Sequence, residues 1–430
     1  MNEAEHMRGY RFAGLLCLFG FFLHIILSGP LLNALGMPYS GDEGAAYAKI
    51  HPGTYFIFLS FLVLLFGSGS PAREFASISR AYAPYMALLC LYLCLFIYIL
   101  VRSGPAGTAF LIDAHMTVPL CALVLSRAPA PLCRKAAYFV IAIAAVNAAI
   151  GIAEVIGHFR IFEFDPGWPV LKEEYFRASA LRGHPLVNAS FTAVALFSAL
   201  ALRMPLWLKL SLGALFVAAL MAFGSRASFI VCLAGLFILG ISKAFRIIRS
   251  RNLSFLRLFG VTSGILILMG GFTLFIFSLL NGPLGERLMA AAHWDDSANS
   301  RLIALSALGR MTPEEIAFGA SAQRILDITY NLNLSAAIEN PWVLMFMNLG
   351  AFWFTLWLAA TIAFIRRLVK NQPLSVKMIA ASFLVITSTY NSFGAKDSSY
   401  MIAVATLICV GKALGAQGLR NIEDRIRLRA

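Results

Sequence analysis

Long runs of apolar residues constrain this chain more than any other feature. Hydrophobic residues make up 60% of its 430 residues, and the mean hydropathy is +0.78. Soluble domains contain about 45–50% apolar residues, so the solvent for most of this chain must be lipid. We therefore predict an all-α polytopic membrane protein.

The apolar runs are close in length to the ~20 residues that a helix needs to cross ~30 Å of hydrocarbon. We predict about twelve spans, near residues 12–32, 53–67, 82–101, 108–125, 136–157, 184–202, 206–224, 227–244, 258–279, 341–365, 378–394 and 400–415. The chain then divides into a transmembrane bundle over residues 1–279, a large outer loop over 280–340, and a second part of the bundle with a basic tail over 341–430.

Basic residues indicate the orientation, because Lys and Arg are retained on the cytoplasmic side of a membrane. Alternate connections between the predicted spans are rich in them, most clearly the segment 243–257 and the C-terminal tail. Both termini are therefore expected in the cytoplasm, with 280–340 on the opposite side. The net charge of +14 follows from this topology and predicts lipid rather than nucleic acid as the partner.

The segment 280–340 concentrates charged residues in a chain that is only 13% charged. Asn299 or Ser300 is a candidate cap for a helix through Leu308, the sequence 312–315 fits a capping box with proline at the first helical position, and Ser321 is a candidate cap for another helix. A loop of this length is expected to be folded, and we expect chemistry near it.

Arg182 lies at the mouth of the sixth predicted span, next to His184 and Asn188. A guanidinium presents a rigid fork of donors that suits phosphate oxygens, and a low dielectric strengthens such pairing. His184 and Asn188 are spaced i, i+4 and share one helix face. The alternative is a helix N-cap with an arginine that extends to the membrane surface.

Arg226 follows Ser225 in the tight turn between the seventh and eighth predicted spans. An arginine on the outer side, against the general charge trend and in a turn too short to reach far into water, is costly unless an anion meets it. We therefore predict that Arg226 binds an anionic substrate. A purely structural arginine remains the alternative.

Other polar residues carry weaker signals. Glu154 near the end of the fifth span must be paired or lie beside water, and the run 387–392 before Lys396 and Asp397 is typical of a hydrated cavity or a helix contact. For Asp113 and His115 we favour a structural role. The cysteines fall in spans or an inner connection, and no metal-ligand spacing is present, so we expect neither a metal nor a cofactor.

Several short motifs resemble those of the O-antigen ligase and O-antigen polymerase superfamily of bacterial envelope polysaccharide enzymes. These motifs are Arg182-Gly183-His184-Pro185, Gly224-Ser225-Arg226, and Asn299-Ser300-Arg301-Leu302 followed by Phe318-Gly319-Ala320. The chain departs from the ligases at Glu339-Asn340, where they carry a His-Asn pair. The resemblance implies a GT-C-like helical bundle with one large periplasmic loop.

The resemblance also implies metal-independent glycosyl transfer from an undecaprenyl-pyrophosphate-linked oligosaccharide to a glycan acceptor. Arg226 and Arg182 would hold the pyrophosphate, and Glu339 would accept the acceptor's proton with support from Asn340. Arg301, His184, Asn188 and Ser225 would contribute to substrate binding. The alternative for Glu339 is a cap and dipole partner for the following helix.

Three functions stay open at this point. A polymerase of exopolysaccharide or O-antigen repeat units is favoured over a ligase because a glutamate replaces the ligase histidine. A flippase or transporter of lipid-linked sugars would also need outer arginines and a hydrated bundle, although we find no inverted repeat. A non-catalytic member of a polysaccharide-assembly complex is the third possibility. Each places the chain in the bacterial inner membrane, with its site facing the periplasm.

Overall fold

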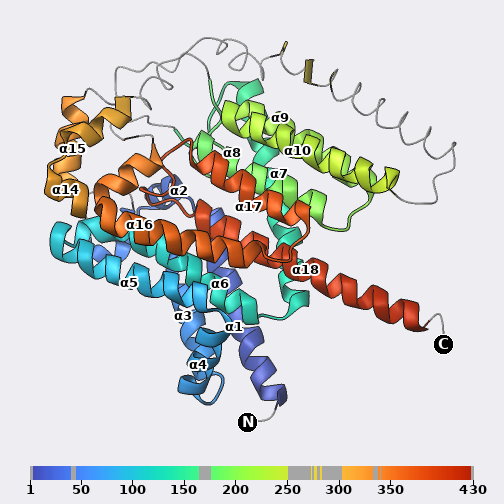
Figure 1. Cartoon of the computed structure of the whole chain (residues 1–430). Helices are drawn as coiled ribbons and strands as arrows, with labels where there is room; N and C mark the ends of the chain where they lie inside the picture. Colours follow the sequence, from blue (N-terminus) through green and yellow to red (C-terminus); the bar gives the residue numbers. More distant parts are fainter. Residues whose placement is uncertain are drawn as a thin grey trace.

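A computed structural model describes residues 3–39, 45–163, 176–249, 273, 276–277, 281–282, 303–332, 338 and 340–427. Its regular elements are all helical (Figure 1). The N-terminal third contains α1 (Glu3–Ile26), α2 (Gly29–Ala34), η1 (Ala46–Lys49), α3 (Pro52–Phe66), α4 (Pro71–Ala81) and α5 (Ala83–Ser103).

The middle of the chain forms a series of helices that run back and forth. They are η2 (Pro105–Thr108), the π-helical turn η3 (Leu111–Met116), α6 (Thr117–Arg127), α7 (Ala130–Gly157), α8 (Pro185–Ala201), α9 (Leu206–Ala222) and α10 (Arg226–Ile248). The C-terminal part contains η4 (Ala307–Arg310), α14 (Pro313–Phe318), α15 (Ala322–Asn331), α16 (Pro341–Val369), α17 (Leu374–Thr387) and α18 (Ser399–Arg427).

Two of the predicted caps in the outer segment are confirmed. Thr312 and Glu315 form a reciprocal capping box, with Pro313 at the first position of α14. The Ser321 hydroxyl accepts a hydrogen bond from the Arg324 amide at the start of α15. Residues 303–306 are helical and continue into η4, whereas the expected cap at Asn299 or Ser300 lies outside the described residues.

The helix α16 is not straight. Trp342 and Trp357 have ring centroids 6.0 Å apart, and Phe346 and Phe354 have centroids 5.6 Å apart. A straight helix rises ~1.5 Å per residue, which would separate these pairs by roughly 22 and 12 Å. The chain therefore reverses at Gly350, which has a φ of +69°, and the first half of α16 folds back over the second (Figure 1).

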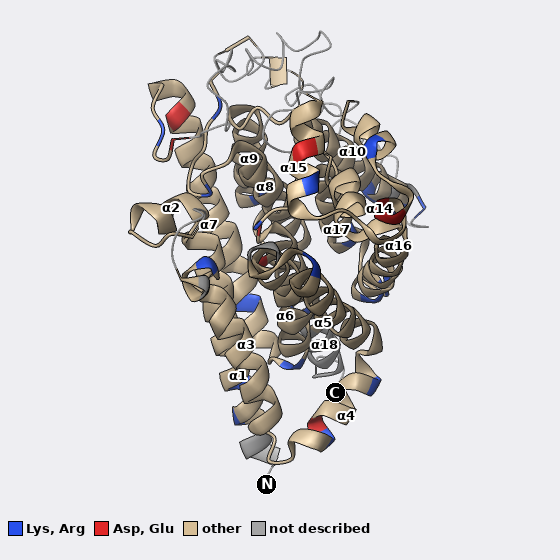
Figure 2. Ribbon diagram, turned by 90° about the vertical axis from the view of Figure 1, so that its left-hand side faces the viewer, with Lys and Arg blue, Asp and Glu red and all other residues tan. Residues whose placement is uncertain are grey.

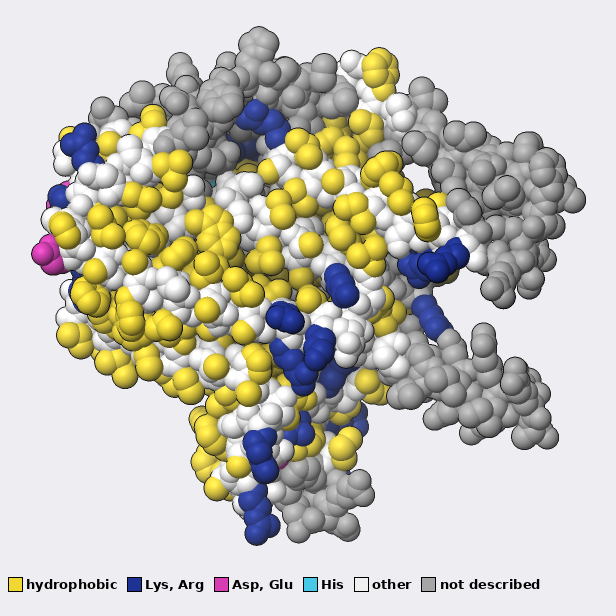
Figure 3. Space-filling model, in the orientation of Figure 1, with side chains coloured by type: hydrophobic (Ala, Val, Ile, Leu, Met, Phe, Trp, Pro, Cys, Tyr) yellow, Lys and Arg dark blue, Asp and Glu magenta, His cyan; other side chains and the backbone are white. Residues whose placement is uncertain are grey.

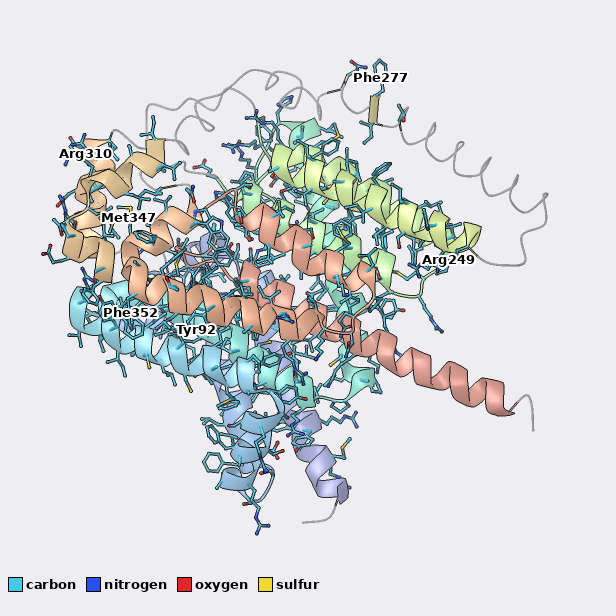
Figure 4. The ribbon with its side chains drawn as sticks, viewed as in Figure 1. Tyr92, Arg249, Phe277, Arg310, Met347 and Phe352 are labelled. Carbon is cyan, nitrogen blue, oxygen red and sulfur yellow. The ribbon has the colours of Figure 1, made fainter. Side chains whose placement is uncertain are left out.

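The reversal at Gly350 is the docking point of α14. Ala320 N donates a hydrogen bond to Met347 O at 2.6 Å, and a side chain at Gly319 or Gly350 would overlap the backbone of the other segment. Both glycines have positive φ. Two backbones can approach this closely only where neither carries a Cβ. Figure 4 shows Met347 and Phe352 on either side of the reversal.

A small second core accompanies this docking. It contains Ala304, Ala307, Met311, Ala320, Ile325, Ile328 and Ile338, together with Val343 and Met347 from the first half of α16. The helix α16 therefore contributes to both this core and the main bundle.

The chain is a multi-pass membrane protein, but the prediction of twelve spans needs correction. Among the described residues, five helices are long and apolar enough to cross a membrane: residues 7–26, α5, α7, residues 226–246 of α10, and α16. The pair α3 and α4, bent by 110°, would make a sixth.

Helix length explains the difference from the prediction. The runs near 184–202, 206–224 and 378–394 form α8, α9 and α17, with only 17, 17 and 14 residues. The run near 108–125 is divided between η3 and the 11-residue α6. Most of 258–279 lies outside the described residues. Apolar runs in the sequence do not reveal where a helix is interrupted.

Candidate functional site

The segment 176–184 is fixed by buried polar side chains of the neighbouring helices. The Glu154 carboxylate at the end of α7 accepts hydrogen bonds from the amides of Ile161, Ser179 and Ala180 at 2.8–2.9 Å. Asn147 Oδ1 accepts one from Leu181 N at 3.1 Å. A carboxylate with three amide donors is well satisfied without a cation, so Glu154 holds this segment in place.

Three further hydrogen bonds complete this support. Asn188 of α8 donates through Nδ2 to the carbonyls of Ser179 and His184. Ala178 N donates to Ala222 O at the end of α9 at 3.1 Å. The segment 176–184 is therefore held by α7, α8 and α9 together.

Arg182 projects from this segment into the bundle, where only 7% of the residue is exposed. Its Nη1 donates to His24 O at 2.7 Å and its Nη2 donates to Ser398 Oγ at 3.0 Å. Nη2 also lies 3.7 Å from the Asp397 carboxylate. Arg182 thus joins α1, the segment 176–184 and the loop 388–398 between α17 and α18.

Asp397 has several donors besides Arg182. Ser399 donates to Oδ1 through its amide at 3.0 Å and its hydroxyl at 2.8 Å, and the Tyr390 hydroxyl donates to Oδ2 at 3.3 Å. Burial raises the pKa of Asp397, and the charge of Arg182 opposes this rise. The pairing therefore favours the ionised carboxylate in a site that by itself disfavours it.

A second carboxylate, Asp113, organises the connection between α2 and α3. It accepts hydrogen bonds from Tyr39 OH at 3.0 Å, Thr54 Oγ1 at 2.7 Å and His51 N at 3.0 Å. Asp113 belongs to the π-helical turn η3, and such turns are frequent at functional sites. Tyr39 and the start of α3, two segments far from Asp113 in the sequence, thus converge on one carboxylate.

His51 and His24 stack beside this carboxylate, with ring centroids 3.8 Å apart. Gly53 N donates to His51 Nδ1 at 3.0 Å, which leaves Nε2 as the donor to Leu27 O at 2.7 Å. The pKa of His51 is lowered to about 4, chiefly by burial; the hydrogen bond to Leu27 O raises it and the charge of Arg182 lowers it. The imidazole of His51 is therefore neutral near pH 7.

Lys396 connects the same loop to the N-terminal region. Its Nζ donates to Tyr39 O at 3.0 Å and to Lys49 O at 2.9 Å, and it lies 4.7 Å from the centroid of the Tyr39 ring. Burial lowers the pKa of Lys396, whereas the Asp113 charge raises it. Lys396 and Asp397, adjacent in sequence, therefore bind two different outer segments to the loop 388–398.

The start of α16 packs against this loop as well. Trp342 lies 5.6 Å from Phe393 between ring centroids, and His115 Nε2 donates to Phe393 O at 2.7 Å. Asn340 Oδ1 accepts hydrogen bonds from the Trp342 and Val343 amides and caps α16. The reversal at Gly350 thus brings the N-terminus of α16 back into the bundle beside the loop 388–398.

Arg226 is the first residue of α10 and is half-buried. Ser225, just before it, is buried and lies 2.6 Å from Ser228 between hydroxyl oxygens. The bond from Ala178 to Ala222 places this turn beside the segment that carries Arg177, also half-buried. Figure 3 shows Lys and Arg side chains in a recess near this end of α8 and α9.

The predicted site residues divide into three groups. Arg182, His184 and Asn188 lie on or against the segment 176–184, Ser225 and Arg226 lie on the neighbouring turn, and Asn340 lies beside the loop that binds Arg182. His184 Nδ1 accepts a hydrogen bond from Leu186 N and caps α8, and burial lowers its pKa to about 4. Glu339 and Arg301 lie outside the described residues.

Sequence analysis missed the central role of the loop 388–398. In the sequence, Lys396 and Asp397 stand out only as the residues after a polar run, and a structural role is predicted for Asp113. The available signal was the presence of charged residues in otherwise apolar surroundings, since ionisable groups at membrane depth require partners. Their partners are far away in sequence, so no local pattern identified them.

No family model matches this chain, and no curated protein matches its sequence. The chemistry that the site could perform is therefore inferred from its geometry. Half-buried arginines on rigidly held backbone suit an anion such as a phosphate ester. Within the described residues no group of three or more His, Cys, Asp or Glu side chains is arranged to hold a metal ion.

Proposed function

We propose that this protein is a membrane glycosyltransferase that polymerises undecaprenyl-pyrophosphate-linked oligosaccharide repeat units. The reaction takes place at the end of the bundle that carries the segment 176–184, on the periplasmic side of the bacterial inner membrane, with both termini in the cytoplasm.

One observation supports the proposal most strongly. Segments selected from the sequence for separate reasons meet around the loop 388–398: Arg182 bonds to it directly, and Trp342, two residues after Asn340, packs on Phe393. The turn with Arg226 is joined to the same assembly through Ala178 and Ala222. Residues that act on one substrate must be brought together by the fold in this way.

The geometry favours different roles for the two arginines. Arg226 is half-buried and begins a helix, where the helix dipole also attracts an anion, so we assign it to the pyrophosphate. Arg177 is a further candidate for the same task. Arg182 is almost completely buried and paired with Asp397, so its contribution to pyrophosphate binding is exerted chiefly through the position of the loop 388–398.

Glu339 completes the proposal as the general base that accepts the proton of the acceptor hydroxyl. Its neighbour Asn340 begins α16, and the reversal at Gly350 directs this helix start toward the loop 388–398. A positive helix end near the site would also stabilise the developing charge of a departing pyrophosphate.

The decisive experiment is polymerisation of a purified lipid-linked repeat unit by the reconstituted protein. We expect Arg226→Ala to lower chain growth by about 10²-fold or more, as expected for loss of a charge-stabilising group, with partial recovery in Arg226→Lys because an ammonium cannot bind in a bidentate manner. Glu339→Gln should bind donor but lose about 10²–10⁴-fold in rate. Arg310→Ala, an exposed arginine in the outer region, is the matched control.

Normal polymer yield from Arg226→Ala at equal protein levels would refute the pyrophosphate role. The same assay separates the ligase alternative, in which one glycan is transferred to a lipid or other acceptor without growth of a polymer.

A lipid-linked sugar transporter is the second candidate, and one observation favours it. The first half of α16 is a discontinuous helix that turns back at Gly350, and interrupted helices commonly form transporter sites. A transporter would move the labelled lipid-linked repeat unit across a proteoliposome membrane without lengthening its glycan, whereas the polymerase would lengthen it in detergent.

A further inference from the structure

The short helix α4 lies at the end of the bundle opposite the candidate site. The preceding helix α3 begins at His51 near Asp113 and ends beside the start of α1, where a Cβ on Gly9 would lie 2.9 Å from Gly67 O. The following helix α5 returns to the other end, where Arg102 donates to the carbonyls of Phe318 and Gly319. The 11 residues of α4 therefore lie between the end of α3 and the start of α5, and the axis of α4 is bent by 110° from that of α3 (Figure 2).

One side of α4 is attached firmly to the bundle. Glu74 is buried, accepts a hydrogen bond from Tyr10 OH at 3.0 Å and lies 3.6 Å from Arg127 Nε. Arg127 Nη2 also donates to Ser77 Oγ at 2.7 Å. These contacts with α1 and α6 fix the rotation of α4 about its axis, so its other side has a defined orientation.

Away from these contacts, α4 is basic on one flank and carries one large aromatic residue on the other, because the period of about 3.6 residues per turn places Phe75 nearly opposite Arg73 and Arg80. Arg73 and Arg80 are exposed, and Phe75 is 46% exposed. Arg367 at the end of α16 donates to Ala81 O at 3.4 Å, which places the exposed Arg366 and Arg367 next to α4. We name the surface formed by Arg73, Arg80, Arg366 and Arg367 the α4 patch.

The described side chains around the α4 patch add to its positive charge. Among the acidic side chains that the structure describes, only Glu74 lies at this end of the bundle, and it is buried against Arg127. Lys370 and Lys377 in and after the α16–α17 connection add further exposed positive charge. Figure 3 shows Lys and Arg side chains gathered over this region, beside the apolar surface of the bundle.

We propose that the α4 patch binds the headgroups of anionic phospholipids in the membrane leaflet at this end. A short amphipathic helix with arginines and an exposed phenylalanine lies in the plane of the interface, with the aromatic ring among the acyl chains. Clusters of four or more Lys and Arg residues beside membrane-spanning helices attract anionic lipid. The patch supplies phosphate-binding guanidinium groups at the depth where the aromatic ring of Phe75 meets the bilayer.

Native mass spectrometry of the purified full-length protein tests this proposal. The protein is incubated in mild detergent with equal amounts of phosphatidylglycerol and phosphatidylcholine that carry identical acyl chains, and the retained lipids are counted. The wild type should retain phosphatidylglycerol preferentially. Arg73→Gln/Arg80→Gln should weaken this preference by about fivefold for each charge removed, whereas Arg73→Lys/Arg80→Lys should keep most of it.

The matched control is Arg134→Gln/Lys135→Gln, which removes the same charge from the start of α7 and should change the preference less than twofold. Equal effects of the two glutamine pairs would show that total positive charge, rather than the α4 patch, attracts the lipid, and would overturn the proposal. Displacement of the retained lipid by millimolar inorganic phosphate would also overturn it, because the site would then bind phosphate without a lipid.

Discussion

Charged residues whose side chains are buried or half-buried occur at both ends of this bundle, and they differ in what they bind. At the end that carries α4, the inner end in the proposed topology, Lys412 of α18 donates to the carbonyls of Leu125, Ser126 and Ala128, all at the end of α6. At the opposite end, the outer end in that topology, Arg182 and Asp397 join the segment 176–184, the loop 388–398 and the end of α1 through their side chains. The inner charge completes one helix terminus, whereas the outer pair connects segments far apart in sequence.

This difference separates structural charges from those that organise a site. Carbonyls at a helix end lack partners within the helix, and a nearby ammonium satisfies them at little cost. A buried ion pair between loops stabilises the fold weakly, but it fixes the relative positions of those loops because either charge alone is costly. Mutation of the outer pair should therefore affect stability and activity in separable ways.

The largest effect on stability is expected from Asp397→Ala. This change leaves the Arg182 guanidinium buried without its carboxylate, which should lower the free energy of unfolding by about 3–5 kcal/mol. The combined change Arg182→Met and Asp397→Leu removes both charges and should restore stability to within about 1 kcal/mol of the wild type. Reversible unfolding in mixed micelles measures both values.

The double variant also tests the organising role. It should remain folded yet lose the proposed polymerisation activity, because the loop 388–398 is no longer aligned by a directional contact. Full activity in a stable double variant would show that this pair, like Lys412, stabilises the fold without organising the site.

The next effect concerns the reversal of α16. Gly350→Ala forces a Cβ into the backbone of Gly319 at a positive φ, which should cost about 3 kcal/mol from backbone strain and overpacking. Gly240→Ala in α10 is the control, since a Cβ there meets no atom within 4 Å and alanine favours a helix by up to about 1 kcal/mol. Equal stability of the two variants would argue against close docking of α14 on α16.

The sequence was sufficient for features that depend on neighbouring residues. The capping box at Thr312 and Glu315 and the cap at Ser321 were predicted because both partners lie within three positions of each other. Membrane character followed from composition. The sequence predicts that Arg182 lies just before a helix, which is α8 in the structure. It does not identify Asp397 as the partner, because this contact depends on the packing of α1, α8 and α18.

The number of spans shows a second limit. Hydropathy treats 341–365 as one continuous apolar run, and nothing in that run except Gly350 indicates that the chain reverses. The reversal is imposed by a tertiary contact with Gly319. Likewise, the contacts of Asp113 could not be predicted, because they form only when Tyr39 and the start of α3, with His51 and Thr54, are brought to it by the fold.

A smaller effect is expected from pH. The pKa of His51 is lowered by burial to about 4, whereas an unfolded histidine has a pKa near 6.5. Below about pH 6.5 the unfolded state therefore binds more protons than the folded state, and stability falls as the pH decreases toward 4. The loss from His51 should be about 2 kcal/mol between pH 8 and pH 5.

His51→Asn isolates this contribution. Asparagine keeps an acceptor for the Gly53 amide at the start of α3, but it does not titrate. The variant should lose about 2 kcal/mol less than the wild type over the same pH range. An unchanged pH dependence would mean that His51 is already accessible to protons in the folded state.

The smallest stability effect is expected at the inner end, from Lys412→Met. Methionine matches the length and apolar stem of lysine but leaves the carbonyls of Leu125, Ser126 and Ala128 without their donor. Because Lys412 is only half-buried and water can reach part of this helix end, the loss should be about 1–2 kcal/mol. Lys370→Met, at an exposed position, should change stability by less than about 0.5 kcal/mol. Polymerisation activity per folded molecule should be unchanged in both variants, since neither residue contacts the segments that meet at the loop 388–398. A specific loss of activity in Lys412→Met at normal stability would erase the distinction between the two ends, because a charge that only completes a helix terminus has no means of altering a site at the opposite side of the membrane.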